Sequence, residues 1–182
     1  MKLVFLVEET SMRDTLNGLL PRVLPADVTW QCIPHEGKSD LEKSIPRKLR
    51  AWKEPDVRFV VLRDQDSADC EKVKTRLVEL CRQGGKADVL VRVVCHELES
   101  WFIGDFQAVE IGMSVEGLTQ LQGKAKFRQP DTLHAPFDEL KKLIPSYQKG
   151  SGARAIAPHL EPSRNRSKSF QVFLDGLRRF AP

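Results

Sequence analysis

Carboxylate side chains follow three apolar segments of the sequence, and their spacing is the first indication of chemistry. Glu8 directly follows the first of these segments, and the pair Asp64 and Asp66 follows the second. Glu97 and Glu99 follow the third. Mg²⁺ binds hard oxygen ligands, and one or two carboxylates together with substrate phosphates are enough to hold it. The pattern therefore indicates a site for Mg²⁺ or Mn²⁺ that serves phosphoryl transfer, with Glu8 as a ligand or a general base.

The same acids have a purely structural alternative, because carboxylates also stabilise the first turn of a helix. Asp66 lies two residues before a helix predicted over residues 68–82 and could cap it. Glu99 falls in the first turn of a helix predicted over residues 98–109, where it would favour the helix dipole. The spacing of the acids leaves both interpretations open.

Short apolar runs alternate with helical periodicity through the first 112 residues, which predicts βαβ units. Buried strands are predicted over residues 2–7, 28–33, 57–62 and 89–95. Helices are predicted after Thr10 and Ser11 and over residues 41–52, 68–82 and 98–109. Strands joined by helices form a parallel sheet with helices on both faces. The expected fold class is therefore three-layer α/β/α with a mainly parallel four-stranded sheet.

A parallel sheet also explains how acids far apart in the sequence can meet. The carboxyl ends of parallel strands lie at one edge, and ligands bind outside that edge near the point where strand order reverses. Three strand ends deliver carboxylates to this edge.

The pattern changes after about residue 112. Gly and Pro become frequent, the apolar runs shorten, and helices are predicted only near residues 137–144 and 170–180. Residues 120–182 hold 12 basic and 5 acidic residues, against 17 and 20 in residues 1–119. We expect one domain over residues 1–182, in which residues 113–182 form a basic, mostly helical extension packed on the core of residues 1–112.

Basic side chains in this extension are candidates for binding phosphate. Five basic residues lie among serines, and such residues hold phosphate oxygens without reading a nucleic-acid sequence: Lys149, Arg154, Arg164, Arg166 and Lys168. Lys38 follows the second strand and is a further candidate phosphate contact. The alternative is a solvated surface, or a surface that docks an acidic partner.

Composition excludes several classes of protein. The chain has 182 residues, 41% of them hydrophobic, and no apolar run approaches the roughly 18 residues that a membrane helix requires. The first apolar run is short and two acids follow it, so we expect no signal peptide and no membrane association. The four cysteines are widely spaced, which predicts free thiols and a cytoplasmic protein.

Several of these segments, taken together, resemble a known family. The end of the first strand at Glu8 and the Asp64-x-Asp66 pair, with βαβ order between them, resemble the Toprim fold of topoisomerases, primases and overcoming-lysogenization-defect nucleases. More closely, the chain resembles the Toprim-like family called domain of unknown function 4276 (DUF4276). The segments that carry this resemblance are the Asp-x-Asp loop, a Glu-x-Trp-x-x-x-Asp block, and residues 6–12, 97–105, 146–149 and 166–170.

The resemblance implies a Toprim core in which Glu8 is the first glutamate and Asp64 and Asp66 bind the metal. It also implies ATPase partners and a role as an effector nuclease in bacterial defence against phage. It favours a site role for Glu99 and a position for Lys149 close to the carboxylates. One departure is Glu9, because many Toprim proteins have Gly directly after the first glutamate.

The leading hypothesis is a Mg²⁺-dependent Toprim-type nuclease that cuts DNA or RNA. Glu8, Asp64 and Asp66 would hold the metal, Glu97 or Glu99 would complete its ligands, and Lys149 would assist catalysis. Two alternatives remain open: a non-catalytic protein that docks on an ATPase partner, and a phosphohydrolase acting on a small nucleotide.

Overall fold

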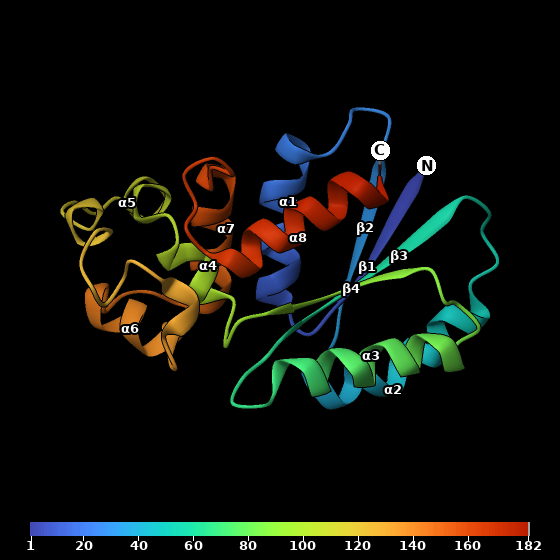
Figure 1. The fold of residues 1–182 in the computed structure, drawn as a ribbon. Helices are drawn as coiled ribbons and strands as arrows, with labels where there is room; N and C mark the ends of the chain where they lie inside the picture. Colours follow the sequence, from blue (N-terminus) through green and yellow to red (C-terminus); the bar gives the residue numbers. More distant parts are fainter. Residues whose placement is uncertain (182) are drawn as a thin grey trace.

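A four-stranded sheet with all strands parallel forms the centre of the computed structural model, which describes residues 1–181 (Figure 1). The strands lie in the order β2-β1-β3-β4. Their bounds are Lys2–Val7 for β1, Thr29–Pro34 for β2, Val57–Asp64 for β3 and Val89–Val94 for β4. The predicted α/β class with a parallel four-stranded sheet is confirmed.

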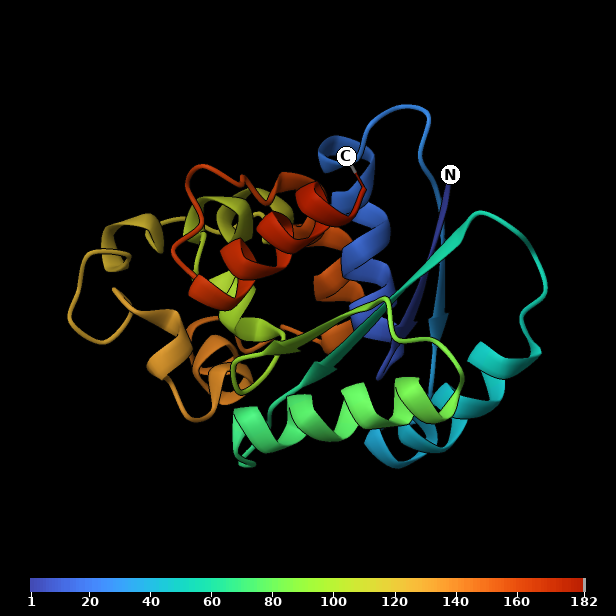
Figure 2. The same ribbon diagram turned by 45° about the vertical axis from the view of Figure 1, so that its right-hand side comes forward.

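Two helices cover one face of the sheet. They are α2, over Lys38–Ala51, and α3, over Cys70–Gln83. Leu41 and Ile45 of α2 and Leu77 of α3 pack there against Val4 and Val61 of the central strands. Both helices lie together below the sheet in Figures 1 and 2.

The other face is covered by α1, over Thr10–Val23, and by the C-terminal helix α8, over Lys168–Phe180. Phe5 and Leu62 point into this side, which holds the larger hydrophobic core. The central strand β1 is buried on both faces, and this is why its sequence reads as an unbroken apolar run.

Four further helices complete this side of the molecule, beyond the end of the sheet (Figure 1). They are α4 (Glu99–Ile103), α5 (Phe106–Met113), α6 (Pro136–Leu143) and α7 (Lys149–Ile156). They share their core with the sheet, and Trp101 of α4 stacks on Phe173 of α8 with ring centroids 5.1 Å apart. The residues after 112 therefore pack against the sheet side rather than forming a separate core.

Two local expectations differ from the structure. The single helix predicted over residues 98–109 is two helices, α4 and α5, because the chain turns at Gly104 and Asp105. A side chain at Gly104 would clash with the segment at Asn165, which packs directly on it. The helix α7 was not predicted, since Gly150 and Gly152 disfavour helix formation.

Two predictions about the surroundings of the protein can be compared with the structure. The four cysteines are free thiols, as predicted. In the part of the chain that the structure describes, no helix is both long and apolar enough to cross a membrane.

Candidate active site

The strand order reverses between β1 and β3. The chain leaves β1 for β2 on one side and then returns to β3 on the other side of β1. Glu8 follows β1 directly, and Asp64 is the last residue of β3. Both carboxylates therefore lie at the position where open parallel sheets bind ligands.

Glu8 is held in place by its neighbours on β3. Its Oε2 accepts a hydrogen bond of 3.2 Å from the backbone N–H of Asp64 and lies 3.7 Å from Nε of Arg63. Arg63 also donates to Glu42 on α2 at 2.7 Å. Burial, and after it the charge of Asp66, raises the pKa of Glu8, although Arg63 opposes the shift. This combination suits a carboxylate that takes up and releases a proton.

Asp64, at the end of the central strand β3, is buried, with 5% of its surface exposed. Its Oδ2 accepts a hydrogen bond of 3.3 Å from the backbone N–H of Leu98. Its Oδ1 is buried and has no hydrogen-bond partner within residues 1–181. Burial raises the pKa of Asp64 well above its usual range, and the charges of Glu8 and Glu99 add to the shift. This carboxylate has a free oxygen and no compensating donor for it.

Glu99, like Asp64, has one carboxylate oxygen that accepts a hydrogen bond and one that has no partner among the described residues. It is the first residue of α4 and is completely buried. Its Oε1 accepts a hydrogen bond of 2.9 Å from the hydroxyl of Tyr147, whereas its Oε2 is buried without a partner among the described residues. Burial raises the pKa of Glu99 to about 6, against the opposing effects of Lys149 and Tyr147.

Lys149 supplies positive charge to these acids. It begins α7, and its Nζ lies 3.4 Å from Oε1 of Glu9, which also accepts a hydrogen bond from Ser11. Burial alone would lower the pKa of Lys149, but the charges of the surrounding acids, led by Glu99 and Glu9, outweigh burial and raise it. The ammonium group therefore stays charged beside the carboxylates. Glu9 is one of its partners.

Asp66 does not cap a helix, and that structural alternative is wrong. The cap of α3 is Asp69, which accepts a hydrogen bond of 2.9 Å from the backbone N–H of Lys72. Asp66 lies in a tight turn with a φ of 55°, a conformation that aspartate tolerates better than most residues. Its carboxylate pairs with Lys38 of α2 at 3.0 Å. This ion pair holds Lys38 at the acidic edge.

Glu97 lies farther out and has a structural contact of its own. Its Oε2 accepts a hydrogen bond of 2.8 Å from the backbone N–H of Phe137. Phe137 is in the first turn of α6, so Glu97 stabilises the start of that helix.

The other predicted phosphate contacts do not gather at this edge. Arg154 of α7 binds Asp14 of α1 at 2.8 Å. Arg166 donates to the backbone carbonyl of Gln122 at 2.9 Å. Arg166 and Lys168 line a separate hollow of about 310 Å³ together with residues 129–132. Of the predicted basic residues, the structure brings Lys38 and Lys149 to the carboxylates.

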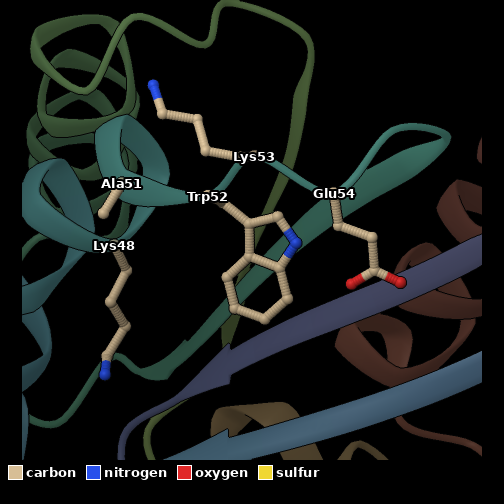
Figure 3. Close-up of a pocket in the computed structure, with 5 residues that line it drawn as sticks. All are labelled: Lys48, Ala51, Trp52, Lys53 and Glu54. Atoms are coloured by element: carbon tan, nitrogen blue, oxygen red, sulfur yellow. The ribbon is translucent and has the colours of Figure 1, made fainter.

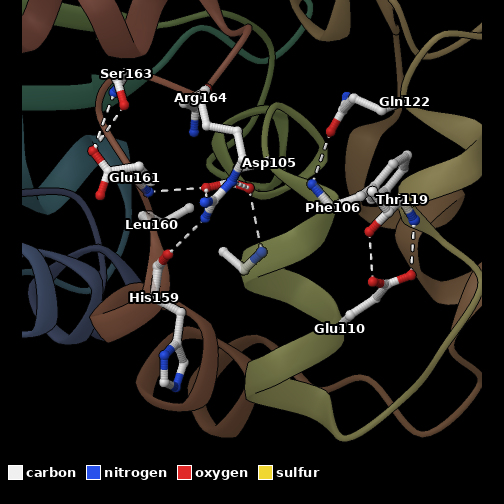
Figure 4. A network of polar contacts seen from close by, with 12 residues as sticks. Asp105, Phe106, Glu110, Thr119, Gln122, His159, Leu160, Glu161, Ser163 and Arg164 are labelled. Atoms are coloured by element: carbon white, nitrogen blue, oxygen red, sulfur yellow. Dashed lines mark hydrogen bonds and ion pairs between the residues drawn. The ribbon is translucent and has the colours of Figure 1, made fainter.

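An ion pair between exposed Arg164 and buried Asp105 fixes the extension to α5 (Figure 4). Asp105 is completely buried, and both of its oxygens accept hydrogen bonds from Arg164, at 2.6 and 3.0 Å. The same carboxylate accepts from the backbone N–H groups of Ala108 and Glu161. Arg164 and Asp105 therefore serve the fold.

Another pocket lies at the opposite end of the strands (Figure 3). It encloses about 330 Å³ beside the end of α2 and is lined by Trp52, Lys53 and Glu54, among others. Glu54 there is paired with Lys2 at the start of β1. The pocket is thus at the amino end of the sheet, away from the acids described above.

The carboxyl edge of the sheet offers oxygen donors for a divalent cation. Within residues 1–181, no three His, Cys, Asp or Glu side chains are placed so that they could hold a metal ion as they stand. Two free oxygens, Asp64 Oδ1 and Glu99 Oε2, are nevertheless the hard ligands that Mg²⁺ prefers. Since Mg²⁺ keeps waters and takes substrate oxygens, two carboxylates are a sufficient protein contribution. The free oxygens of Asp64 and Glu99 therefore fit Mg²⁺ in their donor chemistry.

Sequence reasoning missed two side chains of this site. Arg63 was not singled out, although a basic residue directly before Asp64 is visible in the sequence. Tyr147 lies in one of the segments that carry the family resemblance, but nothing in the sequence shows that its hydroxyl meets Glu99.

Comparison with known proteins gives one result. The family model described as a domain of unknown function (DUF4276) matches residues 7–178. The match covers nearly the whole chain, so the chain belongs to this family. No curated protein and no solved structure is significantly similar to it.

Proposed function

We propose that this member of the DUF4276 family is a Mg²⁺- or Mn²⁺-dependent nuclease that hydrolyses phosphodiester bonds in DNA or RNA. The proposal rests on two free, buried carboxylate oxygens, one on Asp64 at the strand-order reversal and one on Glu99 at the start of α4. The charges of both acids act on Lys149. Burying acids without donors destabilises a fold, and strongly perturbed carboxyl groups in a cluster are typical of functional sites. A bound cation would compensate both charges.

The residues that would hold the cation are Asp64 and Glu99, with Glu8 and Asp66 as neighbouring carboxylates. A bound Mg²⁺ would lower the pKa of a water molecule and neutralise charge on the phosphoryl group. The remaining chemistry belongs to side chains of the chain itself.

Two of these side chains have distinct tasks in the proposal. Lys149 would bind a non-bridging phosphate oxygen through its ammonium group, which the surrounding acids keep protonated. Glu8 would accept the proton of the attacking water, because its raised pKa brings it closer to neutral pH. Arg63 and the backbone N–H of Asp64 hold Glu8 in position for this step.

Further features support a nucleic-acid substrate and a cellular setting for the proposed nuclease. Residues 120–182 carry a strong excess of basic over acidic residues, which attracts a polyanion. Acids at the ends of β1 and β3 support a Toprim-type site, and with it an ATPase partner in anti-phage defence. The four free thiols support a reducing compartment such as the cytoplasm.

A cleavage assay tests this function. The protein is incubated with single-stranded DNA, duplex DNA and RNA, with Mg²⁺, with Mn²⁺ or with a chelator. We expect cation-dependent cleavage that Asp64→Asn lowers by about a hundredfold or more. Asp88→Asn is the matched control, because Asp88 is exposed and precedes β4 at the opposite end of the strands.

Other outcomes would contradict the assigned site or favour one of the two alternative functions. Undiminished cleavage by Asp64→Asn would mean that the site is wrong. No cleavage of any polymer by the folded wild type would favour the docking protein. Turnover of mononucleotides without dependence on polymer length would favour the small-nucleotide phosphohydrolase.

A further inference from the structure

One helix carries a run of basic side chains that the proposed active site does not use. Residues 43–53, which cover most of α2 and the two residues after it, hold five basic and no acidic residues. The five are Lys43, Arg47, Lys48, Arg50 and Lys53. None of them forms an ion pair with any residue that the structure describes. Positive charge is therefore left uncompensated along this helix.

Helical spacing places much of this charge on the outer face of α2. Lys43, Arg47 and Arg50 are exposed, and they occupy positions i, i+4 and i+7, which share one side of a helix. The opposite side of α2 carries Leu41 and Ile45, which pack on the sheet. The basic face is therefore directed away from the core and towards solvent.

The two acids of α2 do not neutralise this face. Glu42 accepts hydrogen bonds from Arg63 and Arg76. Asp40 accepts one from the backbone N–H of Glu36. Both acids precede the basic run and already have donors. A partner that complements the basic face therefore brings its own negative charge.

Two open hollows adjoin at the C-terminal end of α2. One is the pocket of Figure 3, with about 330 Å³, and the other encloses about 380 Å³. Lys48 and Ala51 line both hollows, and Arg47 lines the second. Trp52 lines the first hollow together with Lys48 and Lys53. An aromatic ring among basic side chains is typical of surfaces that hold a nucleic-acid strand.

The helix connects these hollows with the carboxylates of the proposed site. It begins at Lys38, whose Nζ lies 3.0 Å from Oδ2 of Asp66 at the carboxyl edge, and it ends beside the pocket at the amino end of the sheet. Its 14 residues span about 20 Å. A strand of duplex DNA rises about 3.4 Å per nucleotide, so α2 matches about six nucleotides. A strand that lies along α2 would reach the carboxylates at one end.

We propose that the outer face of α2 binds the phosphodiester backbone of the nucleic-acid substrate and leads the strand to the carboxylates. A membrane surface fits this face less well, because a helix that binds a membrane inserts apolar side chains. Within residues 1–181, the exposed large apolar side chains are Met1, Ile111 and Val172, and none of them is on α2. Cleavage of the bound strand rests on the proposed function, whereas binding of the strand does not.

Fluorescence anisotropy with a labelled oligonucleotide of about 20 nucleotides, single-stranded or as a duplex, measures this binding. The full chain is used with a chelator, so that no cation-dependent cleavage occurs, over a series of salt concentrations. The variant Lys43→Gln/Arg47→Gln/Lys53→Gln removes three exposed charges of the basic run. We expect its affinity to fall by about tenfold or more, and its slope of log affinity against log salt concentration to be smaller by about two.

Lys124→Gln/Arg128→Gln/Arg179→Gln is the matched control. It removes the same charge from three exposed side chains of the basic extension, which also have no ion pair among the described residues. We expect its affinity to change by less than about threefold. Equal weakening by both variants would mean that only the overall charge attracts nucleic acid, and a larger effect of the control would place the strand on the extension. Either result would overturn the proposal, and so would absence of binding by the folded wild type.

Binding and cleavage assays together separate this proposal from the proposed function. If the wild type binds nucleic acid through α2 and cleaves none, the proposed function fails alone. If it cleaves through Asp64 and the α2 variant binds like the wild type, the proposed surface fails alone. Where both proposals hold, we expect the α2 variant to raise KM for a long strand by about tenfold and to leave kcat nearly unchanged.

Discussion

The hydroxyl of Tyr147 donates a 2.9 Å hydrogen bond to Oε1 of Glu99, and both side chains are completely buried. Glu99 begins α4 directly after the sheet, whereas Tyr147 precedes α7 in the basic extension. Burial and the charge of Glu99 raise the pKa of Tyr147, so the hydroxyl keeps its proton and donates. The extension thus fixes one oxygen of the carboxylate, and the other oxygen is buried without a partner among residues 1–181.

Removal of this hydroxyl is expected to destabilise the protein. Tyr147→Phe leaves Oε1 of Glu99 buried without a donor, which should cost about 1.5–3 kcal/mol of unfolding free energy at pH 7. Denaturant unfolding measures this loss. The control is the same substitution in a Glu99→Gln background, where the loss should be smaller because no charge is left unpaired. An equal loss in both backgrounds would show that the hydroxyl does not act through the carboxylate.

Stability should fall with rising pH where Glu99 ionises. The pKa of Glu99 is about 6 in the folded protein, above its usual value of 4.5, so the folded state binds the proton more tightly than the unfolded state. Without cations, the unfolding free energy therefore decreases from about pH 4.5 to pH 6, by about 2 kcal/mol in total. Above pH 6 this loss is complete.

Glu99→Gln removes that dependence. We expect the variant to gain stability relative to the wild type as pH rises from 4.5 to 6, and to be about 1–2 kcal/mol more stable at pH 7. Unfolding curves of both proteins at a series of pH values give the difference. A difference that is constant with pH would contradict the ionisation assigned to Glu99.

Two glycines of α7 should respond oppositely to alanine. A Cβ at Gly152 would overlap the ring of Tyr147, so Gly152→Ala must displace this ring and should destabilise the protein by about 1–3 kcal/mol. A Cβ at Gly150 has room, and Gly150→Ala should stabilise the helix by less than about 1 kcal/mol. Thermal unfolding of the two variants and the wild type measures both changes in stability. Stabilisation by both alanines would mean that Tyr147 is not packed on this helix.

Arg164 should be needed for the stability of the fold. Arg164→Ala removes the charged partner of the buried Asp105 carboxylate, which keeps its two backbone donors, and should cost about 1.5–3 kcal/mol of stability. Arg164→Lys keeps the charge but loses the bidentate contact with Asp105, and should cost less stability than Arg164→Ala. Unfolding free energies of both variants test this order. A loss below about 1 kcal/mol for Arg164→Ala would contradict the structural role.

The sequence predicted the sheet well, because buried parallel strands read as short apolar runs. The run from Leu3 to Val7 is fully buried in β1, and the strand following Pro55 becomes β3. The placement of Glu8 and Asp64 at one edge follows from that topology alone. Family membership was predicted correctly from segments spread over the whole chain.

The contacts between the acids and the extension could not be predicted. They depend on how residues 113–181 fold over the end of the sheet, and helix α7 carries two glycines that conceal it. Asp69 rather than Asp66 caps α3, a choice that is decided by one turn of backbone. The hydroxyl of Tyr147 and the turn at Gly104 are likewise fixed by tertiary packing, which leaves no local pattern in the sequence.

Binding of divalent cations tests the central claim most directly. Calorimetric titration of the full chain with Mg²⁺ and with Mn²⁺ is compared for the wild type, Asp64→Asn and the exposed control Asp88→Asn, each in the presence of inorganic phosphate. The account predicts saturable binding by the wild type and by Asp88→Asn, and a loss of at least about tenfold in affinity for Asp64→Asn. Equal binding by all three proteins, or none by the folded wild type, would contradict a cation site at Asp64 and Glu99.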